Sequence, residues 1–360
     1  MNDNELSTER RHEVDALRVL ALLILITFHS SIGFGPAAKW IGIPQNDVLL
    51  TWPQIPLSLF NLLRMPIFYV ISGMAIWFSL MHMSTREVLK HRLRRIAGPL
   101  ILGWFVMAPL CHYTGSLFYS EPYQYEPAEL YFWFLKNILV YMALLTPLAA
   151  RVASDRGQSV RQSIEAGWSK GYIPLAALVL FSAESLLVDK KDYPAYFYGI
   201  HSWLIGFLCF FLGLCCAIGG SSFRKFVLRF RYIFLALAFT FWLGSFIHKS
   251  LYSERVPSIL MSIQSLLSIG AVLGLATAHL NKTMPFFQYA RAAVFPVYIL
   301  HFPIQCILSY MLFPLVLPAT LKLILLNIGI LFLSVAIYEF ILTRVPVLDS
   351  LFGIAKKKSE

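Results

Sequence analysis

Long apolar runs separated by short polar connections fill almost the whole chain. A helix needs roughly twenty apolar residues to cross the hydrocarbon core of a bilayer. The segments that qualify are approximately residues 17–35, 55–81, 96–113, 130–150, 172–188, 197–219, 232–250, 257–280, 292–314 and 320–342. This pattern predicts an all-α, polytopic membrane helix bundle with about ten transmembrane helices.

The composition favours a membrane protein over a water-soluble one. The 360 residues are 58% hydrophobic and 14% charged, and the mean hydropathy is +0.66. A soluble domain is about 45–50% apolar and about 25% charged, so this chain has too little polar surface to coat a soluble globule. The 5 cysteines lie mostly inside apolar runs without zinc-type spacing, and we expect neither a metal site nor a disulfide framework.

The basic residues predict the direction of the spans. With the N-terminus in the cytoplasm, most of the 30 Lys and Arg residues fall in cytoplasmic connections and in the two tails, including the lysines at 356–358. The opposite connection, 111–129, carries Glu121, Glu126 and Glu129 but no Lys or Arg. We therefore expect both termini in the cytoplasm. The basic residues form short clusters between apolar runs rather than one charged face, which argues against a nucleic acid partner.

The chain has no visible internal repeat and no long Gly/Ser linker. The polar segment 1–16 precedes the first span, and no small-residue cleavage site follows that span, so we expect the span to be retained rather than removed as a signal peptide. We predict one integral membrane domain over residues 1–360, with a core at about 12–343.

Two ionisable residues interrupt the first span, Arg18 and His29. They would lie roughly 16 Å apart along a helix. An ionisable side chain in a membrane helix usually faces a protein interior or a water-filled cavity. Imidazole, with an unperturbed pKa near 6.5, is the natural general base for a hydroxyl proton at neutral pH. We expect Arg18, near one membrane face, to meet an anionic donor and His29, deeper in the membrane, to act on it.

Polar positions in the second span and just before the third each allow two interpretations. Arg64 keeps its charge, and it either reaches the outer interface or contacts a bound group. Ser72 and the glycine after it fit a small-residue packing site or a contact to the donor. Arg92, Arg94 and Arg95 either set the topology against anionic headgroups or hold the phosphates of a nucleotide-containing cofactor.

The remaining candidates lie later in the chain. His301 stands between two prolines, and carbonyls freed by a distorted helix often line a cavity. Glu339, in the last span, needs a proton or a cation and could pair with an arginine. His201, Glu184 and His248 lie in or near span ends, where contact with water would explain them.

Together these motifs resemble the acyltransferase family 3 membrane proteins over nearly the whole chain. The family carries Arg-x10-His in its first span, which Arg18 and His29 match. It carries an aromatic pair, two residues and Ser-Gly in the second span, and residues 68–73 depart only by Tyr for Phe. It carries Arg-x-x-Arg at the start of the third span, which Arg92 and Arg95 match.

Three segments resemble one branch of the family, the glucan biosynthesis protein C branch: residues 64–73, 295–301 and 338–340. Members of that branch are linked to succinylation of periplasmic glucans. The resemblance implies a multi-pass inner-membrane enzyme that moves an acyl group, succinyl or acetyl, from cytoplasmic acyl-CoA to a hydroxyl of an extracytoplasmic carbohydrate. Some members carry a fused extracytoplasmic domain that completes the transfer. The predicted spans and tails of this chain include no such domain, so we expect it to act alone or with a separate partner.

The resemblance also assigns roles to the residues. The CoA phosphates would contact Arg92, Arg94 and Arg95 at the start of the third span, Arg18 would lie at the mouth, and the thioester would reach His29. His29 would act either as a general base or as a transient acyl carrier, since imidazole is competent for both. The residues expected to contact substrate or line the cavity are Arg64, Ser72, His301 and Glu339.

Two other classes of protein remain open. A secondary transporter for an anionic solute would also use about ten spans and intramembrane Arg and His, but it would more typically show inverted repeats. A non-catalytic membrane component would keep the fold and lose His29, which is present here.

Overall fold

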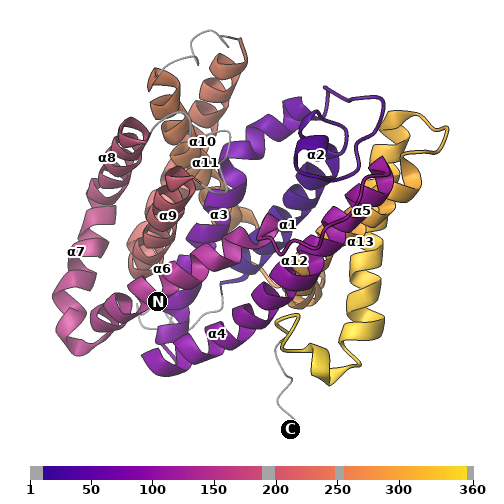
Figure 1. Ribbon diagram of the computed structural model, residues 1–360. Coiled ribbons are helices and arrows are strands. Elements are labelled where there is room, and N and C mark those ends of the chain that lie inside the picture. Colours follow the sequence, from indigo (N-terminus) through magenta and orange to yellow (C-terminus); the bar gives the residue numbers. More distant parts are fainter. Residues whose placement is uncertain (1–10, 189–198, 248–254, 355–360) are drawn as a thin grey trace. The chain divides into compact units, whose positions relative to one another are not determined.

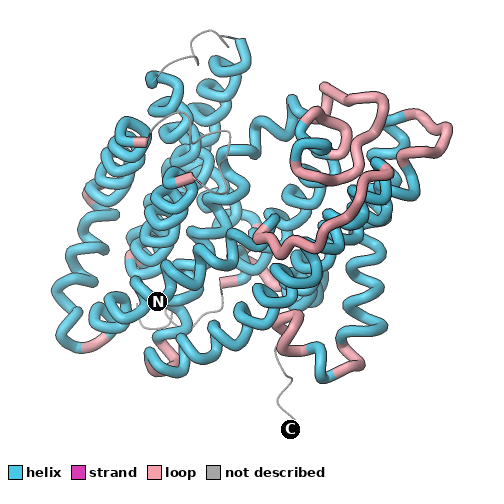
Figure 2. Tube along the Cα trace, viewed as in Figure 1, coloured by secondary structure: helices cyan, strands magenta, loops and turns pink. Residues whose placement is uncertain are grey.

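The structure is a computed structural model that describes residues 11–188, 199–247 and 255–354 (Figure 1). It is 82% helical, and no strand occurs in these ranges. Figure 2 shows helices joined by loops along the whole described trace. The predicted all-α fold is confirmed. His248 and the lysines at 356–358 lie outside the described residues.

The helices follow one another along the chain with short breaks. The α-helices are α1 (His12–Ile32), α2 (Ala37–Trp40), α3 (Gln54–Leu80), α4 (Thr85–Leu102), α5 (Ala108–Tyr119), α6 (Trp133–Ala153), α7 (Gln158–Ser169), α8 (Tyr172–Leu187), α9 (Ile200–Ile218), α10 (Gly220–Ile247), α11 (Arg255–His279), α12 (Pro285–Leu312) and α13 (Ala319–Ile337). Short π-helical or 3-10 segments are η1 (Gly103–Met107), η2 (Leu130–Phe132), η3 (Asp155–Gly157), η6 (Tyr338–Leu342) and η7 (Pro346–Leu348).

Within the described residues, 9 helices are long and apolar enough to cross a membrane. A tenth span arises if the pair Asp155–Ser169 and Tyr172–Leu187, bent by 85°, counts as one. Helix α8 coincides with the predicted span 172–188, but its 16 residues cover only about 24 Å of a hydrocarbon core that is about 30 Å thick. The prediction of about ten spans agrees with this count, and their direction stays a prediction.

Two helices expose long apolar faces. Only 11% of the most apolar part of α10 is buried, and 28% of that of the span formed by α13 and η6 (Ala319–Leu342). Phe239 and Phe246 on α10 and Ile328 and Phe332 on α13 are exposed. Apolar surface of this extent is stable in lipid rather than in water, which identifies a multi-pass membrane protein.

The described chain divides into two compact units. Unit 1 comprises residues 1–18, 59–90 and 137–284, and unit 2 comprises residues 19–58, 91–136 and 285–360. Helices α1, α3, α4 and α6 contribute residues to both units. The single domain expected over 1–360 stays a prediction.

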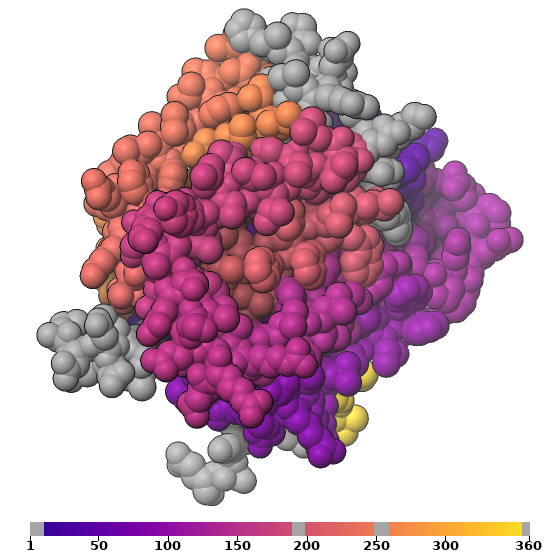
Figure 3. Space-filling view, turned by 90° about the vertical axis from the view of Figure 1, so that its left-hand side faces the viewer, coloured from indigo at the N-terminus to yellow at the C-terminus, as the bar shows by residue number. Residues whose placement is uncertain are grey.

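Close approach of α3 and α9 organises unit 1. A Cβ atom added at Gly73 would lie 2.0 Å from the main-chain oxygen of Phe210, and one added at Gly213 would lie 2.0 Å from that of Val70. Only glycine allows the two backbones to meet at these points, as in other small-residue crossings of membrane helices. Helix α8 packs on α9 and α11 while α7 packs on α10, and α7 and α8 lie on the face seen in Figure 3.

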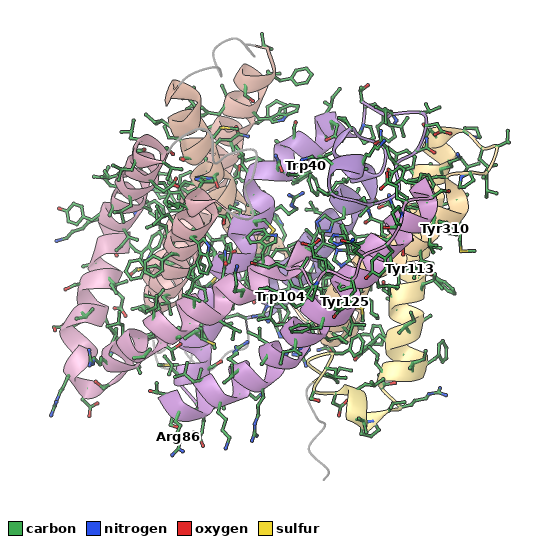
Figure 4. All side chains as sticks on the ribbon, viewed as in Figure 1. Trp40, Arg86, Trp104, Tyr113, Tyr125 and Tyr310 are labelled. Atoms are coloured by element: carbon green, nitrogen blue, oxygen red, sulfur yellow. The ribbon has the colours of Figure 1, made fainter. Side chains whose placement is uncertain are left out.

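Helix α12 forms the core of unit 2, where it packs against α5 and α13. The segment after α5 runs back beside that helix, as Figure 2 shows, because Tyr123 Oη donates to Pro109 O at 3.3 Å and Tyr125 Oη donates to Phe105 O at 2.9 Å. Tyr125, labelled in Figure 4, remains exposed. This returning segment ends at η2, whose Tyr131 contacts α12.

Candidate active site

Two histidines from distant parts of the sequence meet inside unit 2. His29 comes from α1 and His301 from α12, and His29 Nδ1 lies 2.8 Å from His301 Nε2. The two rings are nearly parallel, with an interplanar angle of 6° and centroids 5.1 Å apart. His301 is fully buried, whereas His29 is half-buried. The partner of the predicted catalytic imidazole is therefore a second imidazole.

The hydrogen bonds around His301 fix where the protons lie when both rings are neutral. His301 Nδ1 is 2.5 Å from the main-chain oxygen of Tyr298, which can only accept, so Nδ1 carries the proton. His301 Nε2 is then an acceptor, and His29 Nδ1 must donate to it. This leaves the basic lone pair of His29 on Nε2. A hydrogen-bonded partner that selects the tautomer of a histidine in this way prepares the other nitrogen to accept a proton.

Aromatic rings and one amide surround His29. The ring of Phe302 meets it edge to face at 5.0 Å, and Phe28 lies 5.7 Å away. Gln305, four residues after His301 on α12, donates from Nε2 to the main-chain oxygen of His29 at 2.7 Å. The contacts of Phe302 and Gln305 join α1 to α12 beside the histidine pair.

A reciprocal pair of tyrosines fixes η2 against the same part of α12. Tyr131 Oη donates to Ile299 O at 2.5 Å, and Tyr298 Oη donates to Tyr131 O at 2.7 Å. The Tyr131 ring lies edge to face with His301 at 5.3 Å. Leu130, which precedes it, has a φ of 38°, in a left-handed region that leucine rarely adopts. The two tyrosine bonds hold this strained turn beside the histidines.

The predicted basic cluster lies on α4, which begins well before the expected third span. Arg86, labelled in Figure 4, lies in the first turns of the helix. Arg92 and Arg95 are half-buried and three residues apart, so they share a face of α4, whereas Arg94 is exposed. Arg95 Nε donates to Gly353 O at 3.1 Å, and its guanidinium lies 5.5 Å from the centre of the Phe295 ring.

Three other predicted site residues lie in unit 1. Arg18 belongs to unit 1, where its Nη1 donates to Asp15 Oδ1 at 3.1 Å. Arg64 and Ser72 also lie in unit 1, half-buried on α3, and the Ser72 hydroxyl donates to Phe68 O at 2.7 Å within the helix. The structure brings together His29 and His301 from the predicted set.

Glu339 does not pair with an arginine among the described residues. It lies exposed in η6 of unit 2, and its Oε2 accepts from the Tyr289 hydroxyl at 2.8 Å. The hydrogen bond comes from a neutral phenol rather than from an arginine.

His201 and Glu184 are not at a wet interface as expected. Both are buried in unit 1, and His201 Nδ1 lies 2.7 Å from Glu184 Oε1. The sequence places them near span ends, but the packing of α8 on α9 removes them from solvent. Mutual pairing replaces the water that the sequence interpretation required.

Comparison with protein families decides the class of this chain. The acyltransferase family 3 model, described as an acyltransferase domain, matches residues 11–339, which is most of the chain. The chain belongs to acyltransferase family 3. No curated protein and no solved structure matches it. The predicted family and the general activity of a membrane acyltransferase are confirmed, while the glucan biosynthesis protein C branch stays a prediction.

Two parts of this candidate site were missed in the sequence interpretation. Gln305 was detectable as a buried-type amide inside a span, one helical turn after His301. Tyr131 gave no comparable signal, because its role depends on the return of the segment after α5. The histidine pair joins residues 272 positions apart, a proximity that no local pattern encodes.

Proposed function

We propose that this membrane acyltransferase transfers a succinyl or acetyl group from cytoplasmic acyl-CoA to a hydroxyl of an extracytoplasmic carbohydrate, with His29 as the general base. The observation that carries the proposal is the hydrogen bond from His29 Nδ1 to His301 Nε2. It supports a neutral His29 whose Nε2 can take a proton from a hydroxyl.

In the proposed reaction, His29 carries one proton from the acceptor hydroxyl to the departing thiolate. His29 Nε2 takes the proton of the acceptor hydroxyl while the oxygen attacks the thioester carbon, and the carbonyl electrons move to oxygen. When the tetrahedral intermediate collapses, the carbon–sulfur bond breaks and the imidazolium of His29 returns the proton to the departing thiolate. The products are an ester and free CoA, and no further reactant is required.

Burial favours the base over an acyl carrier. In base catalysis the transient positive charge stays on His29, which is half-buried. Acylation of His29 Nε2 would first give an acyl-imidazolium on His29, and the neutral acyl-imidazole would form only when the Nδ1 proton leaves. His301 Nε2 is the hydrogen-bonded acceptor of that proton, so the positive charge would then pass to a fully buried ring. Charging a buried group without an anionic partner is strongly unfavourable.

Arg92 and Arg95 support the donor side of the proposal. They place two permanent cations on one face of α4. Guanidinium groups bind phosphate oxygens in a bidentate manner. In the proposed enzyme they hold the phosphates of CoA, while Arg94, which is exposed, contributes less.

Mass spectrometry of cell-envelope glycans from cells with and without the protein tests this function. We expect an acyl mass, about 100 Da for succinyl or about 42 Da for acetyl, to be present only with the protein, because each ester adds the acyl group and releases one hydrogen. Glycans with identical acyl content in both strains would contradict the proposal, and a transporter would likewise leave no covalent mark.

A further inference from the structure

The side-chain amide of Gln305 lies beside His29, and only one of its two ends has a hydrogen-bond partner among the described residues. The side chain is 1% exposed on α12, and its Nε2 donates to the main-chain oxygen of His29 at 2.7 Å. Both residues belong to unit 2. The amide therefore has one end bound to the residue that we assign as the base.

The orientation of this amide follows from its partner. A main-chain oxygen can only accept a hydrogen bond, so the NH2 end of Gln305 must face His29, and the exchanged orientation would place two acceptors together. Oε1 is then the second end of the amide. It is buried and has no hydrogen-bond partner in the part of the chain that the structure describes.

A buried amide oxygen without a donor is an unfavourable arrangement that native proteins rarely retain. Because Oε1 shares its carbon with Nε2, it lies next to the contact with His29. The chemistry that satisfies it is an N–H or an O–H group. Both proposed substrates carry such groups, as the amides of the pantetheine arm of acyl-CoA and as the hydroxyls of a carbohydrate.

We propose that Gln305 is a positioning residue of the acyl-transfer site, and that its Oε1 accepts a hydrogen bond from an N–H or O–H group of a bound substrate. This inference rests on the proposed function. The bond orients the substrate against His29, while the opposite end of the same amide holds the His29 backbone in place.

A simpler role is that Gln305 only joins α1 to α12. The two roles differ in what each substitution removes. Gln305→Met keeps the length of the side chain and loses both hydrogen bonds, whereas Gln305→Glu keeps an oxygen that can accept from the substrate. Gln264→Met is a matched control, because Gln264 is also a buried glutamine in a membrane span but belongs to unit 1.

The experiment measures initial rates of purified protein in lipid nanodiscs with succinyl-CoA and acetyl-CoA as donors and octyl β-D-glucoside as acceptor, each varied in turn. We expect Gln305→Met to raise KM for one substrate by about tenfold, the effect of one lost neutral hydrogen bond, and Gln305→Glu to raise it less. Gln264→Met should match the wild type. A raised donor KM assigns the bond to the pantetheine amide, and a raised acceptor KM assigns it to a hydroxyl.

Wild-type transfer with both KM values unchanged in Gln305→Met would overturn the assignment of Gln305 and leave the proposed function standing. Equal thermal destabilisation by Met and Glu, with unchanged KM, would likewise leave only the joining role. A wild-type protein that acylates neither the glucoside nor envelope glycans would overturn the proposed function and this inference with it.

Discussion

Arg95 Nε donates a hydrogen bond to the main-chain oxygen of Gly353 at 3.1 Å, which ties the basic helix α4 to the segment that follows the last span. The same segment touches α4 again, since a Cβ added at Gly98 would lie 1.9 Å from Ser350 O. Gly353 has a φ of 62°, and a Cβ there would meet Phe295 and Arg95 O. The segment thus orients one of the arginines that we assign to the donor.

Substituting Gly98 tests that relationship. In Gly98→Ala the new methyl group cannot share space with Ser350 O, so the segment must move away from α4 at a cost of about 1–3 kcal/mol. We expect a raised KM for acyl-CoA with little change in kcat. Gly244→Ala is the matched control, because a Cβ at Gly244 meets nothing within 4 Å. Equal donor KM in both variants would exclude a role for the segment.

The arginines of α4 should act on donor binding rather than on the chemical step. Arg92→Gln and Arg95→Gln should each raise the KM for acyl-CoA by about tenfold and leave kcat nearly unchanged, because a phosphate contact remote from the reacting carbon gives uniform binding. Arg94→Gln should have a smaller effect, since Arg94 is exposed. Cysteine labelling in residues 120–129, between α5 and η2, from each side of the membrane checks that the orientation is preserved. A reversed orientation would assign these arginines to topology instead.

His301 should affect the rate by holding His29 in the tautomer whose Nε2 is the base. His301→Phe keeps a ring of similar shape but removes the acceptor for His29 Nδ1, so we expect kcat to fall by about 10- to 100-fold, as for other residues that orient a functional histidine. His301→Asn, which retains an acceptor, should recover part of the rate. Rates measured with saturating acyl-CoA decide this, and equal rates for wild type and His301→Phe would remove His301 from the mechanism.

The sequence predicted the elements of this fold much better than their contacts. Apolar length located the spans, since each span must cover the same hydrocarbon thickness. The start of α4 at Thr85 was missed because the basic cluster was interpreted as a loop, although Ser84 and Glu87 form a capping box: Ser84 N donates to Glu87 Oε2 at 2.9 Å, and Glu87 N donates to Ser84 Oγ at 3.4 Å.

The other differences between the predicted and the observed surroundings of residues arise from contacts between segments that are distant in the sequence. His29 and His301 were each identified from the cost of an ionisable group in a membrane, but their pairing depends on how α1 packs on α12. His201 and Glu184 were assigned to water because position along a span does not reveal which face is covered. A small-residue packing site was one of two interpretations of Gly73, and the structure shows that Gly73 packs against α9. The sequence alone did not indicate which helix would pack there.

The two faces of the membrane offer a further test. If donor and acceptor meet at His29, acyl-CoA enclosed in sealed vesicles should acylate a glycan supplied outside, because His29 lies roughly 16 Å along α1 from Arg18. Product formation is followed by mass spectrometry of the external glycan. Transfer only when both substrates share the cytoplasmic side would contradict the trans-membrane route and leave the acyltransferase activity intact.

The most direct test of the central claim is the rate of acyl transfer by His29→Ala. The account predicts that this variant is recovered from the membrane at the wild-type level, because His29 is only half-buried, and that transfer at saturating acyl-CoA falls by about 10²- to 10⁴-fold, the usual contribution of a general base. Folded His29→Ala protein that transfers the acyl group at a near-normal rate would contradict the assignment of His29 as the base.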